Sequence, residues 1–513
     1  MIDYKSLSSN FVKQRMDIIS REDYLSNDDE EFISSNAHHS VEDIDFHLIQ
    51  AIENSSATEI CQCIIMANYY INDENVLYNP SFQSFIRKIL IIIINTNNEY
   101  DMKLRIDSLW LIGKLLQTNN EAIHFLKDLE ILDLFLTLFE NNELDIQKYL
   151  LFCLRQFSLH CDECHFALVG WLQNHENLFI LLKQYIEGID PLNEKLKIPS
   201  ILFLNCLMKK PTCFKITQFC LDTFISVINE AEFDNLFDKA VIGLAYIISN
   251  NDSKVWRPKL TMCYNGSNLS FIDSLIAFLD FIENTMIISN ILRVIIAWYQ
   301  KNEIIENLEI GAIINLLNYS LNNQINPEIQ NEAHNEVNNG ILNGAMNKTT
   351  INEHERENAK KYQRILFISS FTLNTLAECG KPFIVEMVDK NVLEYSMNAY
   401  HHADYQSKIN ISILCSTIAV HGQTGHKKKM IEMGFLNMFV DMFQSKIIDL
   451  SYRSVSAIYS LFQAGQCFDG TNICTNGFIE IGGLDEINEI LEQNEDEKLC
   501  KIAHLLINDY FAE

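Results

Sequence analysis

Glycine and proline are scarce in this chain, with 17 and 7 residues among 513. Both residues interrupt helices, whereas Leu, Ile, Glu and Lys, which favour helices, are abundant. The scarcity argues against a protein built from many tight turns. We therefore expect an all-α fold.

Long hydrophobic runs are also missing. The longest, 89–94, is far shorter than the ~20 residues that a bilayer crossing needs. Residues 1–6 have no apolar core behind them, so no signal peptide is expected. The 14 cysteines lack the spacing of a disulfide framework. These absences favour a reduced protein of the cytoplasm and nucleus that does not associate with membranes.

Positive charge is in short supply. The chain has 39 Lys and Arg against 68 Asp and Glu, for a formal net charge of −29. This balance argues against a nucleic-acid-binding surface. It fits a basic partner such as a lysine-rich peptide, and it equally fits the solvated helix faces of a soluble protein.

The motifs of common enzymes are absent as well. The sequence has no phosphate-binding loop, no G-x-S-x-G and no H-E-x-x-H, so neither catalysis nor a cofactor is expected. Cys161 and Cys164 have C-x-x-C spacing between His160 and His165, but no second ligand pair follows nearby, so no metal site is expected. The lysine run 427–429 could contact an anion, although a solvated helix face is favoured.

An apolar, helix-like stretch recurs along the chain. It occurs at 107–114, 147–156, 198–205, 239–246, 291–297, 368–375, 411–417 and 455–460. The last residues of successive copies are 42, 49, 41, 51, 78, 42 and 43 positions apart. Periods of about 40 to 47 residues are typical of armadillo and HEAT arrays, in which each unit buries its apolar face against its neighbours.

The one long step indicates an insertion at 321–357. This segment is rich in Asn and has few apolar residues, so it cannot bury enough surface to order itself. We expect a disordered loop inside one repeat, and a neutral insertion is favoured over a regulatory one.

The C-terminal segment, 478–513, is the most distinctive. Gly482 and Gly483 precede two apolar stripes with the three-and-four spacing of helix faces. The stripes consist of Ile487, Ile490 and Leu491, then Leu499, Ile502, Ala503, Leu506 and Ile507. The segment resembles the C-terminal armadillo repeat of the importin-alpha (karyopherin-alpha) nuclear import receptors. The resemblance extends over roughly 41–511 and is weakest before Tyr70.

This resemblance implies an armadillo-repeat solenoid, a right-handed superhelix of about ten repeats over 43–513, preceded by a tail at 1–42. In the family, third helices line a concave groove, where a Trp and an Asn four residues later hold a basic cargo peptide. The corresponding groove positions here are Trp110, Lys114, Phe152, Gln156, Asn205, Tyr246, Arg293, Phe371 and Thr375.

Several of these positions depart from the family's Trp–Asn pair. Lys114 replaces the Asn that should follow Trp110, and its charge would repel a basic cargo. Asn205 keeps the amide, but Ile201 replaces the Trp before it. Trp110 and Phe152 are also open to a simpler interpretation as core aromatics.

The resemblance also implies partners. The family's tail binds importin-beta through a long basic segment, whereas here Lys5, Lys13, Arg15 and Arg21 precede the acidic run 28–31. The tail is thus a degenerate importin-beta-binding segment or a disordered one. The family's C-terminal repeat binds an export receptor of the CAS type with Ran-GTP. Acidic residues would form that surface here, namely Glu492, Glu495, Asp496 and Glu497.

The leading hypothesis is a nuclear import adaptor that binds the localisation-signal peptides of cargo proteins in a concave groove. The alternative is an armadillo scaffold that holds other proteins and has no role in transport. The C-terminal repeat favours the adaptor, whereas the eroded Trp–Asn pairs and the poorly basic tail favour the scaffold.

Overall fold

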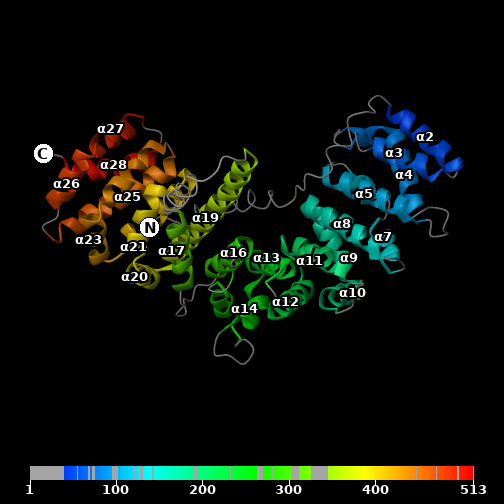
Figure 1. Cartoon of the computed structure of the whole chain (residues 1–513), viewed down its shortest axis with the longest axis horizontal. Coiled ribbons are helices and arrows are strands. Elements are labelled where there is room, and N and C mark those ends of the chain that lie inside the picture. Colours follow the sequence, from blue (N-terminus) through cyan, green and yellow to red (C-terminus); the bar gives the residue numbers. More distant parts are fainter. Residues whose placement is uncertain are drawn as a thin grey trace. The chain divides into compact units, whose positions relative to one another are not determined.

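All regular structure in the described part of this chain is helical. The computed structural model describes residues 40–54, 56–67, 70–71, 75–94, 102–118, 122–127, 131–140, 144–188, 194–230, 233–262, 270–279, 282, 284–301, 311–324, 345–445, 447–468, 471–493 and 496–511. Every helix or strand assigned within these ranges is a helix (Figure 1), which confirms the expected all-α class. Of the helices described, none combines the length and the apolar character that a bilayer crossing requires. The chain divides into two compact units, Met1–Glu130 and Ile131–Glu513.

The first unit is a small group of helices around an apolar core. It contains α2 (Val41–Glu53), α3 (Ala57–Ala67), η3 (Val76–Tyr78), α4 (Pro80–Ile94), α5 (Met102–Thr118) and α6 (Ala122–Lys127). Helix α2 begins at a capping box, in which Ser40 and Asp43 bond each other's backbone N–H. Helix α5 packs against α3 and α4, and it buries Leu109 and Ile112 completely.

The second unit is organised around a series of long helices. These are α8 (Leu144–His160), α11 (Glu194–Met208), α13 (Asn235–Asn250), α16 (Thr285–Lys301), α19 (Ala345–Cys379), α22 (Tyr405–His421), α25 (Ile448–Gly465) and α28 (Glu497–Tyr510). Each packs against the next in this order. One recurring apolar stretch lies on each helix from α8 to α25, and the remaining copy lies on α5. The recurring pattern therefore marks one buried helix per repeat.

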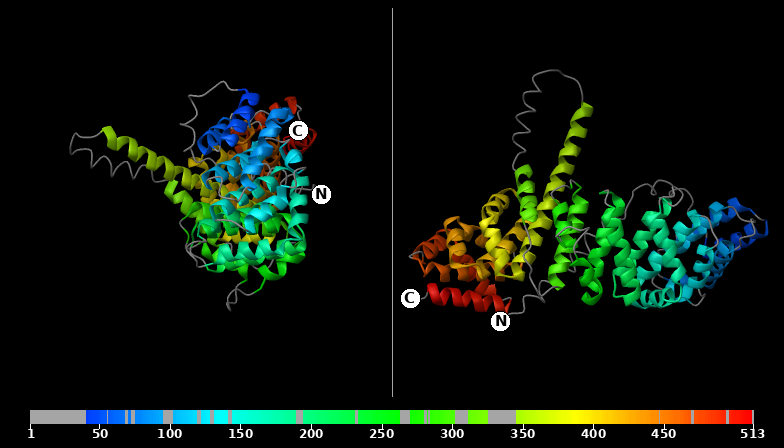
Figure 2. Two further views of the ribbon diagram at one scale, coloured as in Figure 1. Left: turned by 90° about the vertical axis from the view of Figure 1, so that its right-hand side faces the viewer. Right: turned by 90° about the horizontal axis from the view of Figure 1, so that it is seen from below.

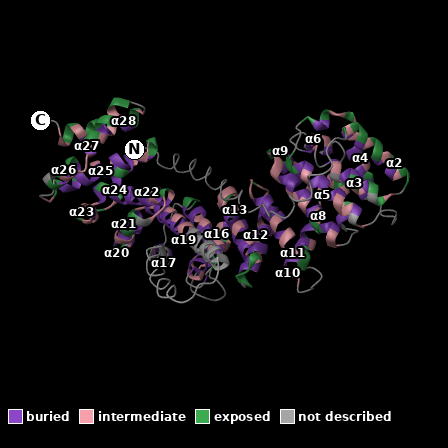
Figure 3. Ribbon diagram, turned by 45° about the horizontal axis from the view of Figure 1, so that its top comes forward, coloured by how far each residue is buried: buried purple, intermediate pink, exposed green. Residues whose placement is uncertain are grey.

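Shorter helices pack against this series. They are α7 (Ile131–Glu140), α9 (Asp162–Leu172), α10 (Glu176–Glu187), α12 (Phe214–Asn229), α14 (Ser253–Leu260), α15 (Phe271–Phe278), α17 (Gly311–Gln324), α20 (Lys381–Asp389), α21 (Val392–His402), α23 (Thr424–Glu432), α24 (Phe435–Asp441), η5 (Phe443–Ser445), α26 (Thr471–Glu480) and α27 (Gly483–Gln493). Buried residues lie where helices face one another (Figure 3). Fully buried phenylalanines such as Phe203, Phe224 and Phe435 fill the space between them.

The segment expected to be a disordered insertion, 321–357, is helical at both of its ends. Helix α17 continues to Gln324, α19 already begins at Ala345, and residues 325–344 lie outside the described ranges. The first half of α19 stands clear of the packed helices (Figure 2). Its sequence places Glu and Lys three and four residues apart, as at Glu357 and Lys361, and this spacing favours a helix even without packing. The expected disorder of 325–344 concerns residues outside the described ranges and stays a prediction.

The C-terminal repeat has the two helices that its stripes predict. Gly482 has φ 77°, a left-handed conformation that suits glycine, and α27 begins immediately after it. Ile487 on α27 and Leu499 and Leu506 on α28 are buried. The ring of Phe478 lies 5.7 Å from that of Phe462, centroid to centroid. This repeat therefore covers the apolar side of α25.

Candidate protein-binding surface

The expected groove residues lie on the long helices. Trp110 and Lys114 lie on α5 in the first unit. In the second unit Phe152 and Gln156 lie on α8, Asn205 on α11, Tyr246 on α13, Arg293 on α16, and Phe371 and Thr375 on α19. Because these five helices pack in consecutive pairs, the fold brings residues from distant parts of the sequence onto adjacent helices.

Two of the aromatic positions already hold a cation from this chain. Lys114 Nζ lies 5.6 Å from the ring centroid of Trp110, one helical turn away. Lys209 Nζ lies 5.6 Å from the ring centroid of Tyr246. Such cation–π contacts contribute about 0.5–1 kcal/mol at exposed sites. An incoming lysine side chain would compete with the chain's own lysines for these two ring faces.

All four aromatic positions are only partly accessible. Phe152 and Phe371 are intermediate in exposure, and so are Trp110 and Tyr246. All four rings therefore retain some open surface, unlike the fully buried core phenylalanines. The simpler interpretation of Trp110 and Phe152 as core aromatics stays open, because intermediate exposure leaves most of each side chain buried.

The amide positions are turned toward neighbouring helices. Asn205 is 4% exposed, and its Nδ2 donates to the backbone carbonyl of Lys239 on α13 at 2.8 Å. Its Oδ1 lies against Gly243, so close that a Cβ added there would overlap it. Gln156 is also buried. The Asn205 amide thus fastens α11 to α13, where the family resemblance implied a contact with the cargo backbone.

The two remaining polar positions also make bonds within the chain. Thr375 is buried and its Oγ1 donates to the carbonyl of Phe371, four residues earlier, at 3.1 Å. Arg293 Nη1 donates to Asn290 Oδ1 at 2.9 Å. These side chains stabilise their own helices, so a bound peptide would have to offer better partners to recruit them.

A buried carboxylate that the sequence analysis missed joins α13 and α16. Asp238 is 5% exposed and Asn290 is fully buried, and Asn290 Nδ2 donates to Asp238 Oδ1 at 2.5 Å. Lys239 Nζ lies 3.1 Å from Asp238 Oδ2. The signal that could have revealed it is a polar residue on an otherwise apolar helix face, since such residues are normally paired when buried.

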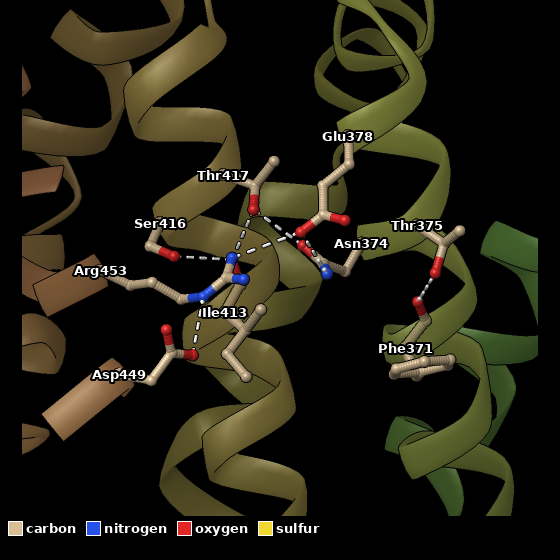
Figure 4. A network of polar contacts seen from close by, with 9 residues as sticks. All are labelled: Phe371, Asn374, Thr375, Glu378, Ile413, Ser416, Thr417, Asp449 and Arg453. Carbon is tan, nitrogen blue, oxygen red and sulfur yellow. Dashed lines mark hydrogen bonds and ion pairs between the residues drawn. The ribbon is translucent and has the colours of Figure 1, made fainter. Parts of the chain in front are cut away.

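A second network spans α19, α22 and α25 (Figure 4). Arg453 Nη1 lies 3.3 Å from Glu378 Oε1, and Arg453 Nε lies 3.2 Å from Asp449 Oδ2. Thr417 Oγ1 donates to Asn374 Oδ1 at 2.8 Å, and Asn374 Nδ2 donates to Glu378 Oε1 at 3.3 Å. Asn374, one residue before the expected Thr375, thus bonds across from α19 to Thr417 on α22.

The expected export-receptor surface is only partly available. Glu492 and Glu497 are exposed. Asp496 is the N-cap of α28, and its carboxylate accepts the backbone N–H of Leu499 at 2.8 Å. Glu495 lies outside the described residues. Two of the four acidic side chains thus face solvent, and one of them, Glu497, lies in the first turn of α28, where its charge also favours the helix.

The other clusters have structural explanations. Ser158 and His165 are buried, with Ser158 Oγ 3.1 Å from His165 Nδ1 and His165 Nε2 3.3 Å from the carbonyl of Pro211. Burial lowers the pKa of His165, which favours its neutral form. Over the described ranges, no three His, Cys, Asp or Glu side chains are close enough to hold a metal ion together.

The lysine run 427–429 is engaged by its surroundings. Lys427 Nζ donates to Ser460 Oγ at 2.7 Å, and Lys429 Nζ lies 2.6 Å from Glu394 Oε1. Lys428 lies 3.9 Å from Glu432, one turn away. Burial and the nearby Lys381 lower the pKa of Lys427. The run thus supports the packing of α23 as well as being a solvated face.

Comparisons with known proteins bear on the fold alone. The sequence matches no protein-family model and no curated protein. Among solved structures, a crystal structure of an engineered protein matches with a TM-score of 0.55 and 12% sequence identity. The match covers 93% of this chain and 100% of that one. At this identity the likeness indicates a shared helical fold and nothing about activity.

Proposed function

We propose that this chain is a divergent nuclear import adaptor of the armadillo-repeat class, which binds lysine-rich segments of cargo proteins along its series of long helices. The observation that carries the proposal is that series, in which each repeat contributes one long helix in contact with the next. Stacked repeats of this kind present extended surfaces for protein partners. The resemblance of 478–513 to the importin-alpha C-terminal repeat supplies the transport role.

Charge supports a basic cargo. The formal net charge of −29 attracts lysine-rich segments and repels nucleic acids. In the second unit, the partly exposed rings of Phe152, Tyr246 and Phe371 provide faces for the aliphatic stems and ammonium groups of lysines. Trp110 provides a further face of this kind within the first unit. Binding is expected to be weaker than in a groove with intact Trp–Asn pairs, because Asn205 already bonds to α13.

The test uses Lys114, which lies over the Trp110 ring. Lys114→Asn removes both the competing cation and its repulsion of the cargo, so affinity for a fluorescent lysine-rich peptide should rise by about two- to five-fold, as expected from ~0.5–1 kcal/mol. Trp110→Ala should lower the affinity. Lys254→Asn is the matched control, because Lys254 is exposed on α14, which carries none of the expected groove positions, and its loss changes the net charge equally.

The outcomes separate cleanly in an anisotropy titration. Equal gains from Lys114→Asn and Lys254→Asn would mean that only net charge matters, and the groove assignment would be wrong. No binding by the wild type or by Lys114→Asn would remove cargo binding from the proposal.

The rival function is a scaffold without a transport role, and a specific observation favours it. Asn205, Arg293 and Thr375 all bond within the chain, which suits a surface no longer used to pin an extended peptide. A pull-down with the full chain as bait separates the two functions. Capture of importin-beta supports the adaptor, whereas its absence together with other captured partners supports the scaffold.

The export step has its own test. Deleting the chain from Phe478 onward would uncover the Phe462 side of α25, so misfolding would obscure the result. Reversing the exposed charges with Glu492→Lys and Glu497→Lys avoids this problem. The double variant, as a fluorescent fusion in cells, should accumulate in the nucleus. A matching reversal at the exposed Glu53 of α2 should leave the distribution unchanged. If both fusions distribute like the wild type, these two carboxylates do not bind the export receptor.

A further inference from the structure

Two thiols lie unusually close together at the start of α9. Cys161 is the N-cap of this helix, and its Sγ accepts the backbone N–H of Cys164 at 3.4 Å. The Sγ atoms of Cys161 and Cys164 are 3.1 Å apart, and neither residue is in a disulfide. Sulfur atoms in a disulfide are about 2.0 Å apart, so a closing motion of roughly 1 Å would join them.

The two thiols differ in access. Cys161 is partly exposed, beside the exposed side chains of Asp162 and Glu163, whereas Cys164 is 2% exposed. A reagent in solution therefore reaches Cys161 first. Cys164 Sγ, 3.1 Å from Cys161 Sγ, is then placed to attack the sulfur of a modified Cys161. One accessible thiol with a shielded second thiol beside it is the arrangement of an attacking and a resolving cysteine.

Metal binding explains the pair less well. A structural zinc site needs four ligands. Both ring nitrogens of the adjacent His165 are occupied, one by Ser158 and one by the carbonyl of Pro211. Elsewhere in the described ranges no third His, Cys, Asp or Glu completes a cluster with these cysteines. Burial as ordinary core residues is also excluded for Cys161 by its exposure, in contrast to the fully buried Cys153 and Cys220.

We propose that Cys161 and Cys164 are a redox modification site, which a low-molecular-weight disulfide such as oxidised glutathione converts reversibly into an intrachain disulfide. The Cys161 thiolate attacks one glutathione sulfur, which breaks the glutathione S–S bond and releases one glutathione thiolate. The Cys164 thiolate, its proton lost to solvent, then attacks Cys161 Sγ and releases the second. In balance, two protein thiols and one oxidised glutathione give one protein disulfide and two reduced glutathiones.

The position of the pair gives the modification a local effect. Cys161 directly follows α8, and Cys164 lies in the first turn of α9. The disulfide would therefore fix the turn between these two helices. Its neighbour His165 anchors α9 to the loop before α12 through Pro211, so the turn is already held on its other side.

The experiment uses the full chain in buffers of stepped reduced-to-oxidised glutathione ratio. Samples are quenched with acid, alkylated with N-ethylmaleimide and digested with trypsin. The tryptic peptide 156–183 contains Cys161 and Cys164 and no other cysteine, so its mass reports the pair directly. We expect this peptide to lose two hydrogens. The equilibrium constant for forming the disulfide from the two thiols and oxidised glutathione should be at least tenfold larger in the folded chain than in the chain unfolded by guanidinium. This ratio corresponds to a difference of about 30 mV in reduction potential.

Substitutions assign the roles of the two thiols. Cys161→Ser keeps a good N-cap residue, so α9 stays capped, and the shielded Cys164 should then remain unmodified. Cys164→Ser should leave glutathione attached to Cys161, and Cys164→Ala serves if the serine disturbs folding. Cys467→Ser, at an exposed cysteine, should change nothing at 156–183. Equal constants in the folded and unfolded chain, or a wild type that stops at the glutathione adduct, would overturn the proposal.

Discussion

Gly243 on α13 offers the sharpest test of how the repeats pack. A Cβ added at this position would overlap Asn205 Oδ1 on α11 and the ring of Phe224 on α12. The Phe224 ring is completely buried, and the Asn205 amide is held by its bond to the Lys239 carbonyl, so neither can simply move aside. Gly243→Ala should therefore force α13 away from both neighbours.

Two opposing effects set the magnitude. Replacing glycine by alanine inside a helix stabilises it by about 1 kcal/mol when nothing interferes. Overpacking a well-filled core costs about 1–3 kcal/mol, and losing the Asn205 hydrogen bond costs on the order of 1 kcal/mol more. The clash exceeds the gain, so Gly243→Ala should be destabilising by roughly 1–3 kcal/mol overall.

Gly170 on α9 is the matched control, because a Cβ there has no atom within 4 Å. Gly170→Ala should show the helix-forming gain alone and raise the unfolding midpoint. Urea titrations followed by circular dichroism compare the variants by midpoint, since a repeat array need not unfold in two states. If both substitutions raise the midpoint alike, α13 is not as close to α11 and α12 as described. Adding Phe224→Leu, which shortens the obstructing ring, should recover part of the loss.

The remaining predictions concern pH and the network of Figure 4. Burial lowers the pKa of His165, so below its ordinary value of about 6.5 the unfolded chain binds more protons and stability falls with acid. His165→Gln should flatten the fall in unfolding midpoint as the pH drops below about 6.5, and an unchanged slope would mean that other histidines dominate. Arg453→Met leaves the half-buried Glu378 without its 3.3 Å ion pair and should cost about 1–3 kcal/mol, which a lower urea midpoint would report. Asp449→Asn removes only an exposed contact and should cost under about 1 kcal/mol, so equal losses would contradict the assigned burial.

Periodicity in the sequence predicted much of the fold. The helices that carry the recurring apolar stretch can be recognised without knowing how they pack, because a helix that buries one face repeats its apolar residues at every third and fourth position. The stripes at Ile487 and Leu499 likewise predicted α27 and α28. The borders of the Asn-rich segment were harder to predict, because the charge spacing at Glu357 and Lys361 favours a helix that composition hides.

The candidate surface was less predictable. The register of four residues placed Asn205 and Thr375 on long helices, as the structure has them, but could not give the direction in which each side chain points. Asn205 is fastened to α13 because Gly243 lets the two helices approach, a relation between residues far apart in sequence. Asp238 and Asn290 form another pair of this kind, separated by 52 residues. Such partners become visible only once the helices are placed side by side.

The bond between Arg453 and Glu378 has a consequence for how the C-terminal half comes apart. Helix α22 lies between α19 and α25 in the packing order, so this ion pair joins two helices that are not consecutive members of the series. A stack with contacts only between neighbours loses its repeats one at a time from an end. A link that skips one member couples three helices, so amide hydrogens on α22 and α25 should exchange together. Unfolding that starts at the C-terminus would then include α25 and α22 in a single step and would stop only at α19.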